Sequence, residues 1–311
     1  MLTGQPFEDL RAILEQLPPA DECAARKFSE ACINEAFTDD QGLVELGGWL
    51  ASWQGRDAPA MKDVHICLLA SSYKGAGAPE DVLGYIAATA KGRAPVNLMC
   101  VDGGIGLRAL EMAPQMPHDP KADWQQADCM AAVAFGMEAA ASGGDLLGLA
   151  ALAPGGAVHA IATIMAVTGM TLDDPALLSL QDQERHKIQD LLDQAVGQKL
   201  DALEALRRFG GREIAGAVGA VVATRSRRLP MLIEGWSPLA AVVVLESTMP
   251  GSCAHVRVTA PENGVQREML LRLGMVPLIN QPVGVGPGCS VPVASRLLAL
   301  ACLLPSVPHF K

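Results

Sequence analysis

The chain alternates between short, continuously apolar runs and longer segments in which apolar residues recur every three or four positions. Four apolar runs have the length of strands and no polar alternation, namely residues 64–70, 96–101, 146–149 and 231–233. A strand of this kind is buried on both faces of its sheet. These runs therefore predict four strands of a buried sheet.

Segments with helical spacing separate these runs, at residues 81–91, 123–141, 158–167, 176–195 and 212–223. Three more helices are predicted before the first strand, at residues 7–17, 24–37 and 44–53. Buried strands that alternate with helices indicate a parallel sheet with helices on both faces. We predict an α/β fold of this kind.

Composition narrows the possible partners and the compartment. The formal net charge of −10 gives no general attraction for nucleic acid or for an anionic membrane. The eight cysteines form no Cys-x-x-Cys pair, which predicts free thiols in a reducing cytoplasm and no bound metal. No cofactor is expected either.

Residues 146–172 carry no formal charge and are numerous enough to span a bilayer. Pro154-Gly155-Gly156 interrupts this stretch. We predict a buried strand, a turn and a buried helix there, and no membrane span.

Two glycine-rich turns precede predicted helices. One contains Gly155 and Gly156, and the other contains Gly286, Gly288 and Ser290, with Ser290 expected as the N-cap of the last helix. Parallel sheets bind ligands at the carboxyl ends of their strands, and amides at a helix N-terminus suit a phosphate. Tight packing of strand against helix explains the same glycines equally well.

Three single residues have simpler interpretations. His255 fits a structural histidine and Cys289 a buried thiol. Lys187 fits the solvated face of a helix.

Taken in order, several segments resemble the nicotinate-nucleotide–dimethylbenzimidazole phosphoribosyltransferases, which act in cobalamin lower-ligand synthesis. The residues 209–214, FGGREI, are similar to that family's Gly-Gly-x-Glu-Ile-Ala segment, and LPMLIEGW at 229–236 is similar to its Pro-apolar-Asp-Gly-Phe segment. Residues 254–255 and LGMVPLIN at 273–280 resemble its Ala-His and Leu-Gly-x-x-Pro-Leu-Leu-Asp. The likeness covers roughly the whole chain.

The resemblance implies a reaction and an assembly. A base nitrogen attacks ribose C1′ of nicotinate mononucleotide, nicotinate leaves, and a carboxylate removes the azole proton. The resemblance also implies a homodimer with its site near the subunit interface. It divides the chain into a helical part at 1–60, an α/β core at 61–290, and a helix at 291–311 that returns to a smaller subdomain.

The sequence departs from the family where the resemblance places its chemistry. Ala151 stands where the family's loop after the third strand has a glutamate, and Pro287 stands where its final loop, Arg-Leu-Gly-Glu-Gly, has the general base. Ser72-Tyr73 replaces the family's Asp-His, and residues 37–43 replace its Pro-Pro-Gly-Ser-Leu-Gly. Lys187 corresponds to the family's helix lysine.

Three hypotheses follow. The first is a phosphoribosyltransferase for altered substrates with a substitute acid. Asp102, Asp145, Glu234 and Glu262 are the candidates, and Glu234 is favoured because it ends a strand beside a glycine. The second is a catalytically silent homologue that binds a nucleotide or an aromatic base.

The third is a nicotinamide- or flavin-binding protein, which the glycine spacing disfavours. Under the first two hypotheses, the residues predicted to hold the phosphate or nucleotide are Gly155, Gly156, Lys187, Gly286, Gly288 and Ser290.

Overall fold

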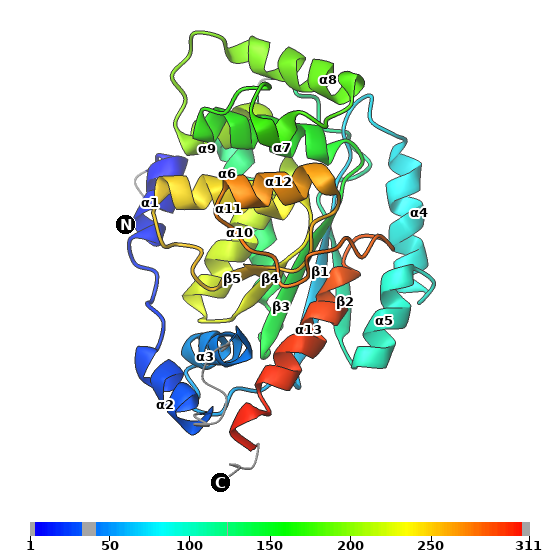
Figure 1. Cartoon of the computed structure of the whole chain (residues 1–311). Coiled ribbons are helices and arrows are strands. Elements are labelled where there is room, and N and C mark those ends of the chain that lie inside the picture. The colour runs from blue at the N-terminus through cyan, green and yellow to red at the C-terminus, as the bar shows by residue number, and fades with distance from the viewer. Residues whose placement is uncertain (1–3, 33–41, 123, 307–311) are drawn as a thin grey trace.

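A five-stranded parallel sheet lies at the centre of the protein, with the strand order β2-β1-β3-β4-β5 (Figure 1). The structure is a computed structural model that describes residues 4–32, 42–122 and 124–306. The strands are β1 (Val64–Ala70), β2 (Gly106–Glu111), β3 (Leu146–Leu152), β4 (Met231–Ile233) and β5 (Val256–Val258). The predicted α/β fold with a parallel sheet is confirmed.

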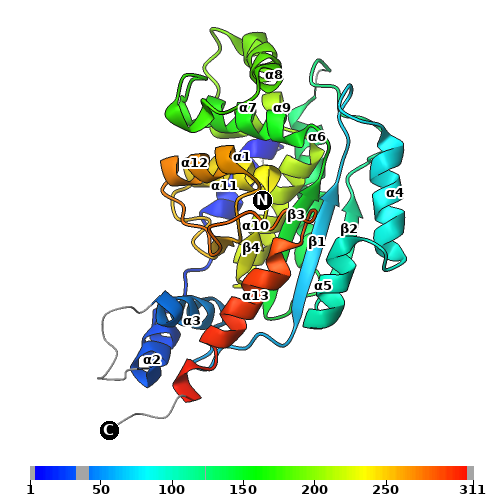
Figure 2. The same ribbon diagram turned by 45° about the vertical axis from the view of Figure 1, so that its right-hand side comes forward.

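Helices cover both faces of this sheet (Figure 2). The α-helices are α1 (Pro6–Leu14), α2 (Glu22–Cys32), α3 (Gly42–Gln54), α4 (Pro79–Ala90), α5 (Pro95–Gly103), α6 (Gln126–Gly136), α7 (Gly156–Thr168), α8 (Asp182–Leu192), α9 (Ala202–Phe209), α10 (Arg212–Ser226), α11 (Trp236–Thr248), α12 (Gly264–Arg272) and α13 (Ser290–Ala301). Short 3₁₀ turns are η1 (Met137–Ala140), η2 (Pro175–Leu177), η3 (Asp193–Ala195) and η4 (Leu304–Ser306).

Strand β1 shows why its run has no polar alternation. Successive side chains of a strand point to opposite faces. Cys67 and Leu69 enter the larger core, with α6, α7, α10 and α11. Ile66 and Leu68 enter a second core, with α3, α5 and α13. Both faces are buried, so both sets must be apolar.

The predicted strand at residues 96–101 is wrong, because this segment forms α5. Pro95 occupies the first turn of the helix, where it suits the fixed φ of proline. Asn97 accepts a 3.0 Å hydrogen bond from the Ala94 N–H and donates one of 3.0 Å to the Thr89 carbonyl. A short apolar run does not distinguish a strand from a buried helix, and here the proline and the asparagine favour the helix.

Two strands were not predicted. No residue of the edge strand β2 is fully buried, and the strand carries Arg108 and Glu111, so it lacks an apolar run. Strand β5 has only three residues, and Arg257 in its middle breaks the apolar run.

The terminal helices do not form one body. Helices α2 and α3 pack together beside the C-terminal half of α13 (Figure 1). Helix α1 instead packs against α6, and its Phe7, Leu10 and Leu14 enter the larger core. The domain boundaries at 60 and 290 stay predictions. The last part of the predicted helix at 24–37, and most of the departing segment at 37–43, lie outside the described residues.

The charge-free stretch at 146–172 contains β3, a turn at residues 153–155, and α7. Within the described ranges, no helix combines the length and the apolarity that crossing a membrane requires.

Candidate functional site

A cleft of about 380 Å³ opens at the carboxyl ends of β3, β4 and β5. This is the edge at which parallel sheets bind ligands. The lining residues come from the turn after β3, the ends of β4 and β5, and the loop before α13: Ala151, Leu152, Ala153, Pro154, Glu234, Ala260, Pro261, Glu262, Val283, Gly284, Gly286, Pro287 and Ser290. The fold therefore brings Ala151 and Pro287, which are more than 130 residues apart in the chain, into one cleft.

The loop before α13 needs its glycines for its backbone. Gly284, Gly286 and Gly288 all have positive φ, at 67°, 147° and 83°. A Cβ atom at Gly288 would also lie 2.9 Å from Cδ2 of Leu68 in β1. The loop is thus a tight turn pressed against the sheet, as the packing interpretation of its glycines predicts.

Glu234, at the end of β4, holds this loop in place. Its Oε1 accepts a 2.9 Å hydrogen bond from the Gly288 N–H, and its Oε2 accepts bonds from the Ser290 N–H and Oγ at 2.8 and 2.5 Å. Burial raises the pKa of Glu234, although these hydrogen bonds act to lower it.

These contacts bear on two predictions for the loop. The first turn of α13 already has an anion in the carboxylate of Glu234, so the amides of Gly288 and Ser290 have a partner without any phosphate. Ser290 is the first residue of α13, and Cys289 is the N-cap. The prediction of Ser290 as the N-cap is therefore wrong, because its hydroxyl bonds Glu234 and Thr259 instead.

Glu262, after β5, is the second carboxylate of the cleft. The residue as a whole is exposed and lines the cleft, while its carboxylate packs against Gly235 and is largely removed from water. This loss of water, followed by the charge of Glu234, raises the pKa of Glu262 to about 7, and the Trp236 backbone N–H opposes the rise. A carboxyl group with this pKa exchanges protons readily near neutral pH.

Gly235 makes room for Glu262. The φ of Gly235 is 91°, and a Cβ atom there would lie only 2.4 Å from Oε1 of Glu262. Glu234 thus supplies one carboxylate of the cleft, and Gly235 leaves room for the carboxylate of Glu262.

The turn after β3 places Gly155 at the N-cap of α7, with φ 82° and its surface exposed. Gly156 is buried, and a Cβ atom there would lie 3.1 Å from Glu213 Oε1 and 3.3 Å from Ser237 Oγ. Pro154, just before these glycines, lines the cleft. The N-terminus of α7 therefore lies beside the cleft.

A cluster of three buried polar residues, which the sequence analysis did not predict, lies beneath this turn. Tyr73, Glu213 and His159 are all nearly inaccessible, and the rings of Tyr73 and His159 stack with centroids 3.9 Å apart. The Gly-Gly-Arg-Glu segment contained the signal for Glu213. For Tyr73 the signal was its position directly after β1.

The other candidate acids lie elsewhere. Asp102 is exposed and pairs with Arg296. Asp145 precedes β3, at the opposite edge of the sheet, and pairs with Arg56 at 2.7 Å. Lys187 is exposed on α8 and does not line the cleft, so its role stays a prediction.

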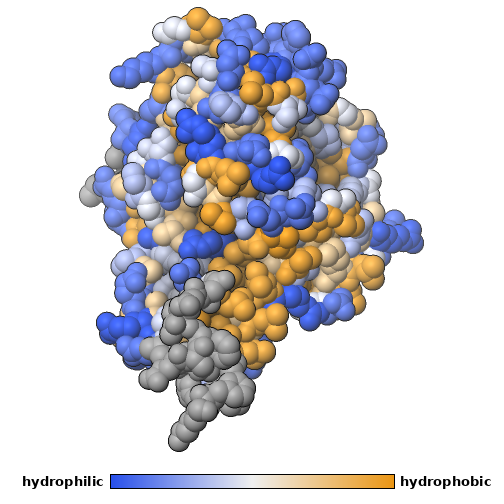
Figure 3. Space-filling model, in the orientation of Figure 1, coloured by the Kyte–Doolittle hydropathy of each residue, from blue (hydrophilic) through white to orange (hydrophobic). Residues whose placement is uncertain are grey.

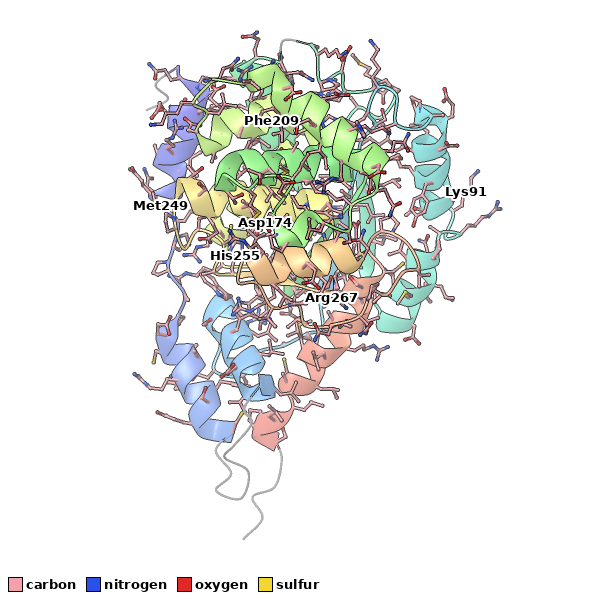
Figure 4. All side chains as sticks on the ribbon, turned by 45° about the horizontal axis from the view of Figure 1, so that its top comes forward. Lys91, Asp174, Phe209, Met249, His255 and Arg267 are labelled. Carbon is pink, nitrogen blue, oxygen red and sulfur yellow. The ribbon has the colours of Figure 1, made fainter. Side chains whose placement is uncertain are left out.

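Cys289 and His255 carry groups that could react, but the surroundings of both indicate a structural role. Cys289 is buried, and burial raises the pKa of its thiol to about 11, which fits an unreactive thiol. His255 is completely buried (labelled in Figure 4) and lies 2.9 Å from the Thr224 hydroxyl. Burial lowers the pKa of His255 to about 3, as expected for a neutral structural histidine.

Comparison with known proteins identifies the family. A sequence model described as phosphoribosyltransferase matches residues 41–307. Nicotinate-nucleotide–dimethylbenzimidazole phosphoribosyltransferases from Brucella canis and from Brucella abortus strain 2308 are 30% identical to this chain, over 97% of it and 94% of theirs. The chain belongs to this family.

Solved structures agree on the fold of this family member. The nicotinate-nucleotide–dimethylbenzimidazole phosphoribosyltransferase from Thermus thermophilus superposes with a TM-score of 0.80 at 18% identity, over 93% of this chain and 97% of that one. A structure of CobT from the same organism gives 0.78 at 19% identity, over 93% and 96%.

Proposed function

We propose that this protein transfers the phosphoribosyl group of nicotinate mononucleotide to an aromatic base, as the names of its relatives describe for them. The observation that carries the proposal is the cleft at the carboxyl ends of β3–β5. Glu262, with a pKa of about 7, and the turn at the start of α7 both line this cleft. The family relationship supplies the class of reaction, and the cleft supplies a place for it.

In this proposal the nucleotide's phosphate lies at the N-terminus of α7. Gly155, the N-cap of α7, is exposed there, and the dipole of the helix favours an anion at this end. The first turn of α13 is less suited, because Glu234 already occupies it. Gly286 then shapes the wall of the cleft rather than binding phosphate.

The experiment is direct. The purified protein is incubated with nicotinate mononucleotide and dimethylbenzimidazole, and released nicotinate and ribosylated base are separated by liquid chromatography. The proposal expects both products in equal amounts. Without the base, nicotinate release should stay at the level of a sample that lacks the protein.

A second candidate is a homologue that binds nucleotide or base without transfer. It is favoured by Ala151 and Pro287, which put inert side chains at both positions where the resemblance places glutamates. It expects no nicotinate release, together with a rise in melting temperature when nicotinate mononucleotide is added. Turnover would exclude it.

We also propose that the protein forms a homodimer in the cytoplasm. Leu98 and Val101 on α5 are 77% and 81% exposed, and Leu300 on α13 is 58% exposed. Figure 3 shows apolar surface over α13. Val285, in the loop whose neighbouring residues line the cleft, is a further exposed apolar side chain, at 53%. The cytoplasmic location is supported by eight cysteines that are all free thiols.

Light scattering after size exclusion tests the dimer. Val101→Glu places a charge in the proposed interface and should yield monomers. Val196→Glu, at a comparably exposed valine (77%) between α8 and α9, is the control and should leave the dimer intact. A monomeric wild type would disprove the assembly.

A further inference from the structure

The cleft contains two carboxylates, and they are not equivalent. Glu234 uses both oxygens to hold the loop before α13, through three hydrogen bonds of 2.5–2.9 Å. A base must be able to turn its oxygen toward the substrate and to accept a proton there. Both oxygens of Glu234, the acid that the sequence favoured, are already hydrogen-bonded to the loop.

Glu262 has no such set of donors. Among the charged and polar groups of the described chain, only the Trp236 backbone N–H acts to lower its pKa, while Glu234 raises it. Gln266 bonds the backbone N–H of Glu262 at 2.6 Å, which fixes the main chain and leaves the carboxylate to the cleft. The residue is exposed and lines the cleft, so a substrate bound in the cleft can reach it.

Resting on the proposed function, we propose that Glu262 is the catalytic base of this protein and takes the place of the glutamate replaced by Pro287. The unprotonated ring nitrogen of the acceptor forms a bond to ribose C1′. The bond between C1′ and the nicotinate nitrogen breaks, and its electron pair stays on nicotinate. The N–H proton of the acceptor passes to the carboxylate of Glu262.

The lining of the cleft also defines the class of acceptor. No lysine, arginine or histidine belongs to the described residues that line it, while two carboxyl groups do. Such surroundings disfavour an anionic acceptor and favour a neutral azole that can donate an N–H to a carboxylate. The apolar walls, from Ala151, Leu152, Pro154 and Val283, suit an aromatic ring.

Glu234 is a positioning residue in this arrangement. It holds the loop that closes the cleft, and its charge keeps the pKa of Glu262 high. The charge of Glu234 acts on Tyr85 and Cys289 as well, and because it and burial raise pKa values that already lie above 7, both residues stay neutral near pH 7. No cation of the lining neutralises the pair.

The kinetic test compares Glu262→Gln with Glu268→Gln, an exposed glutamate on α12 that is next to Arg267. Loss of a general base typically costs about 10²–10⁴-fold in rate. We expect Glu262→Gln to lower kcat for dimethylbenzimidazole by at least about 10²-fold, with an unchanged KM for nicotinate mononucleotide.

The pH profile is the second readout. The wild-type kcat/KM should rise with pH through the pKa of Glu262, and this rising limb should disappear in Glu262→Gln. Undiminished kcat in this variant would overturn the assignment.

A binding test keeps the assignment independent of turnover. Wild type should bind dimethylbenzimidazole more tightly than its N-methyl derivative, which has no N–H to donate, and Glu262→Ala should lose this preference. If the preference is present but no nicotinate is released, the proposed function fails while the contact to Glu262 stands. If nicotinate is released and the variants behave like wild type, the proposed function stands and the role of Glu262 fails. Absence of both the preference and the turnover overturns both.

Discussion

Tyr73 donates a 2.5 Å hydrogen bond from its hydroxyl group to Oε1 of Glu213, and both side chains are buried beneath the turn that begins α7. The Ser237 hydroxyl donates a second bond, of 3.2 Å, to the same oxygen. Burial raises the pKa of Glu213, so the folded protein favours its protonated form more than the unfolded chain does. A buried acid of this kind makes stability depend on pH.

The first prediction concerns that dependence. Between the unfolded pKa of about 4.3 and the higher folded pKa, only the folded state keeps the proton on Glu213. The free energy of unfolding therefore falls as pH rises through this window. Glu213→Gln removes the effect because an amide does not titrate, while its oxygen can still accept the hydrogen bonds from Tyr73 and Ser237. We expect the stability of this variant relative to wild type to increase with pH.

Urea unfolding at a series of pH values checks this prediction. The exposed Glu268→Gln is the control and should give a difference from wild type that does not change with pH. A constant difference for Glu213→Gln as well would show that Glu213 has the same pKa in both states.

The second prediction concerns the carboxylate that holds the loop. In Glu234→Gln, one oxygen becomes an NH₂ group that faces a donor from Gly288 or from Ser290, so at least one hydrogen bond is lost. A buried polar group left without a partner costs about 1–3 kcal/mol. We expect destabilisation of that size, and faster hydrogen exchange at the amides of Gly288 and Ser290.

Glu246 offers a matched control. It accepts hydrogen bonds from the N–H groups of Gly251 and Cys253 after α11, away from the cleft. Glu246→Gln should leave exchange at Gly288 and Ser290 unchanged. Equal exchange in Glu234→Gln and wild type would contradict the holding role.

The third prediction separates backbone strain from crowding in the loop. Gly284 and Gly288 both have positive φ, but a Cβ atom has open space at Gly284 and would lie 2.9 Å from Leu68 at Gly288. Gly284→Ala should cost only the strain of the left-handed conformation, about 1–2 kcal/mol. Gly288→Ala should lower the free energy of unfolding further, because Leu68 must also move. Equal losses in chemical denaturation would mean that the loop relaxes away from β1.

How far the sequence predicted this molecule depended on the physical signal in each segment. Strands β1, β3 and β4 are buried on both faces, so their continuous apolar runs predicted them correctly. The run at 96–101 failed because apolarity reports burial rather than conformation, and the deciding residues, Pro95 and Asn97, act through the first turn of α5.

The site shows the same limit. The resemblance placed Ala151 and Pro287 in one site, and position after a strand added Glu234; all three line one cleft. The rule of position after a strand favoured Glu234 over Glu262. The two acids differ because the amides of Gly288 and Ser290 bond the oxygens of Glu234. That contact depends on how the loop before α13, more than 50 residues further along the chain, packs against β4.

The last prediction joins Pro287 to Glu262. Both line the cleft, and Pro287 stands between Gly286 and Gly288 where the resemblance places the family's base. In the Glu262→Gln background, Pro287→Glu returns a carboxylate to the cleft, while Pro287→Gln returns only its shape. If Glu262→Gln loses proton removal, the added glutamate should raise kcat at least about tenfold, out of the 10²–10⁴-fold that a general base contributes. The added glutamine should not raise it.

In wild type, the same Pro287→Glu adds a like charge to the cleft that contains Glu262 and should move the rising limb of the pH profile to higher pH. Equal kcat for the Glu and Gln double variants would show that the backbone of the loop, rather than a proton acceptor, limits the reaction.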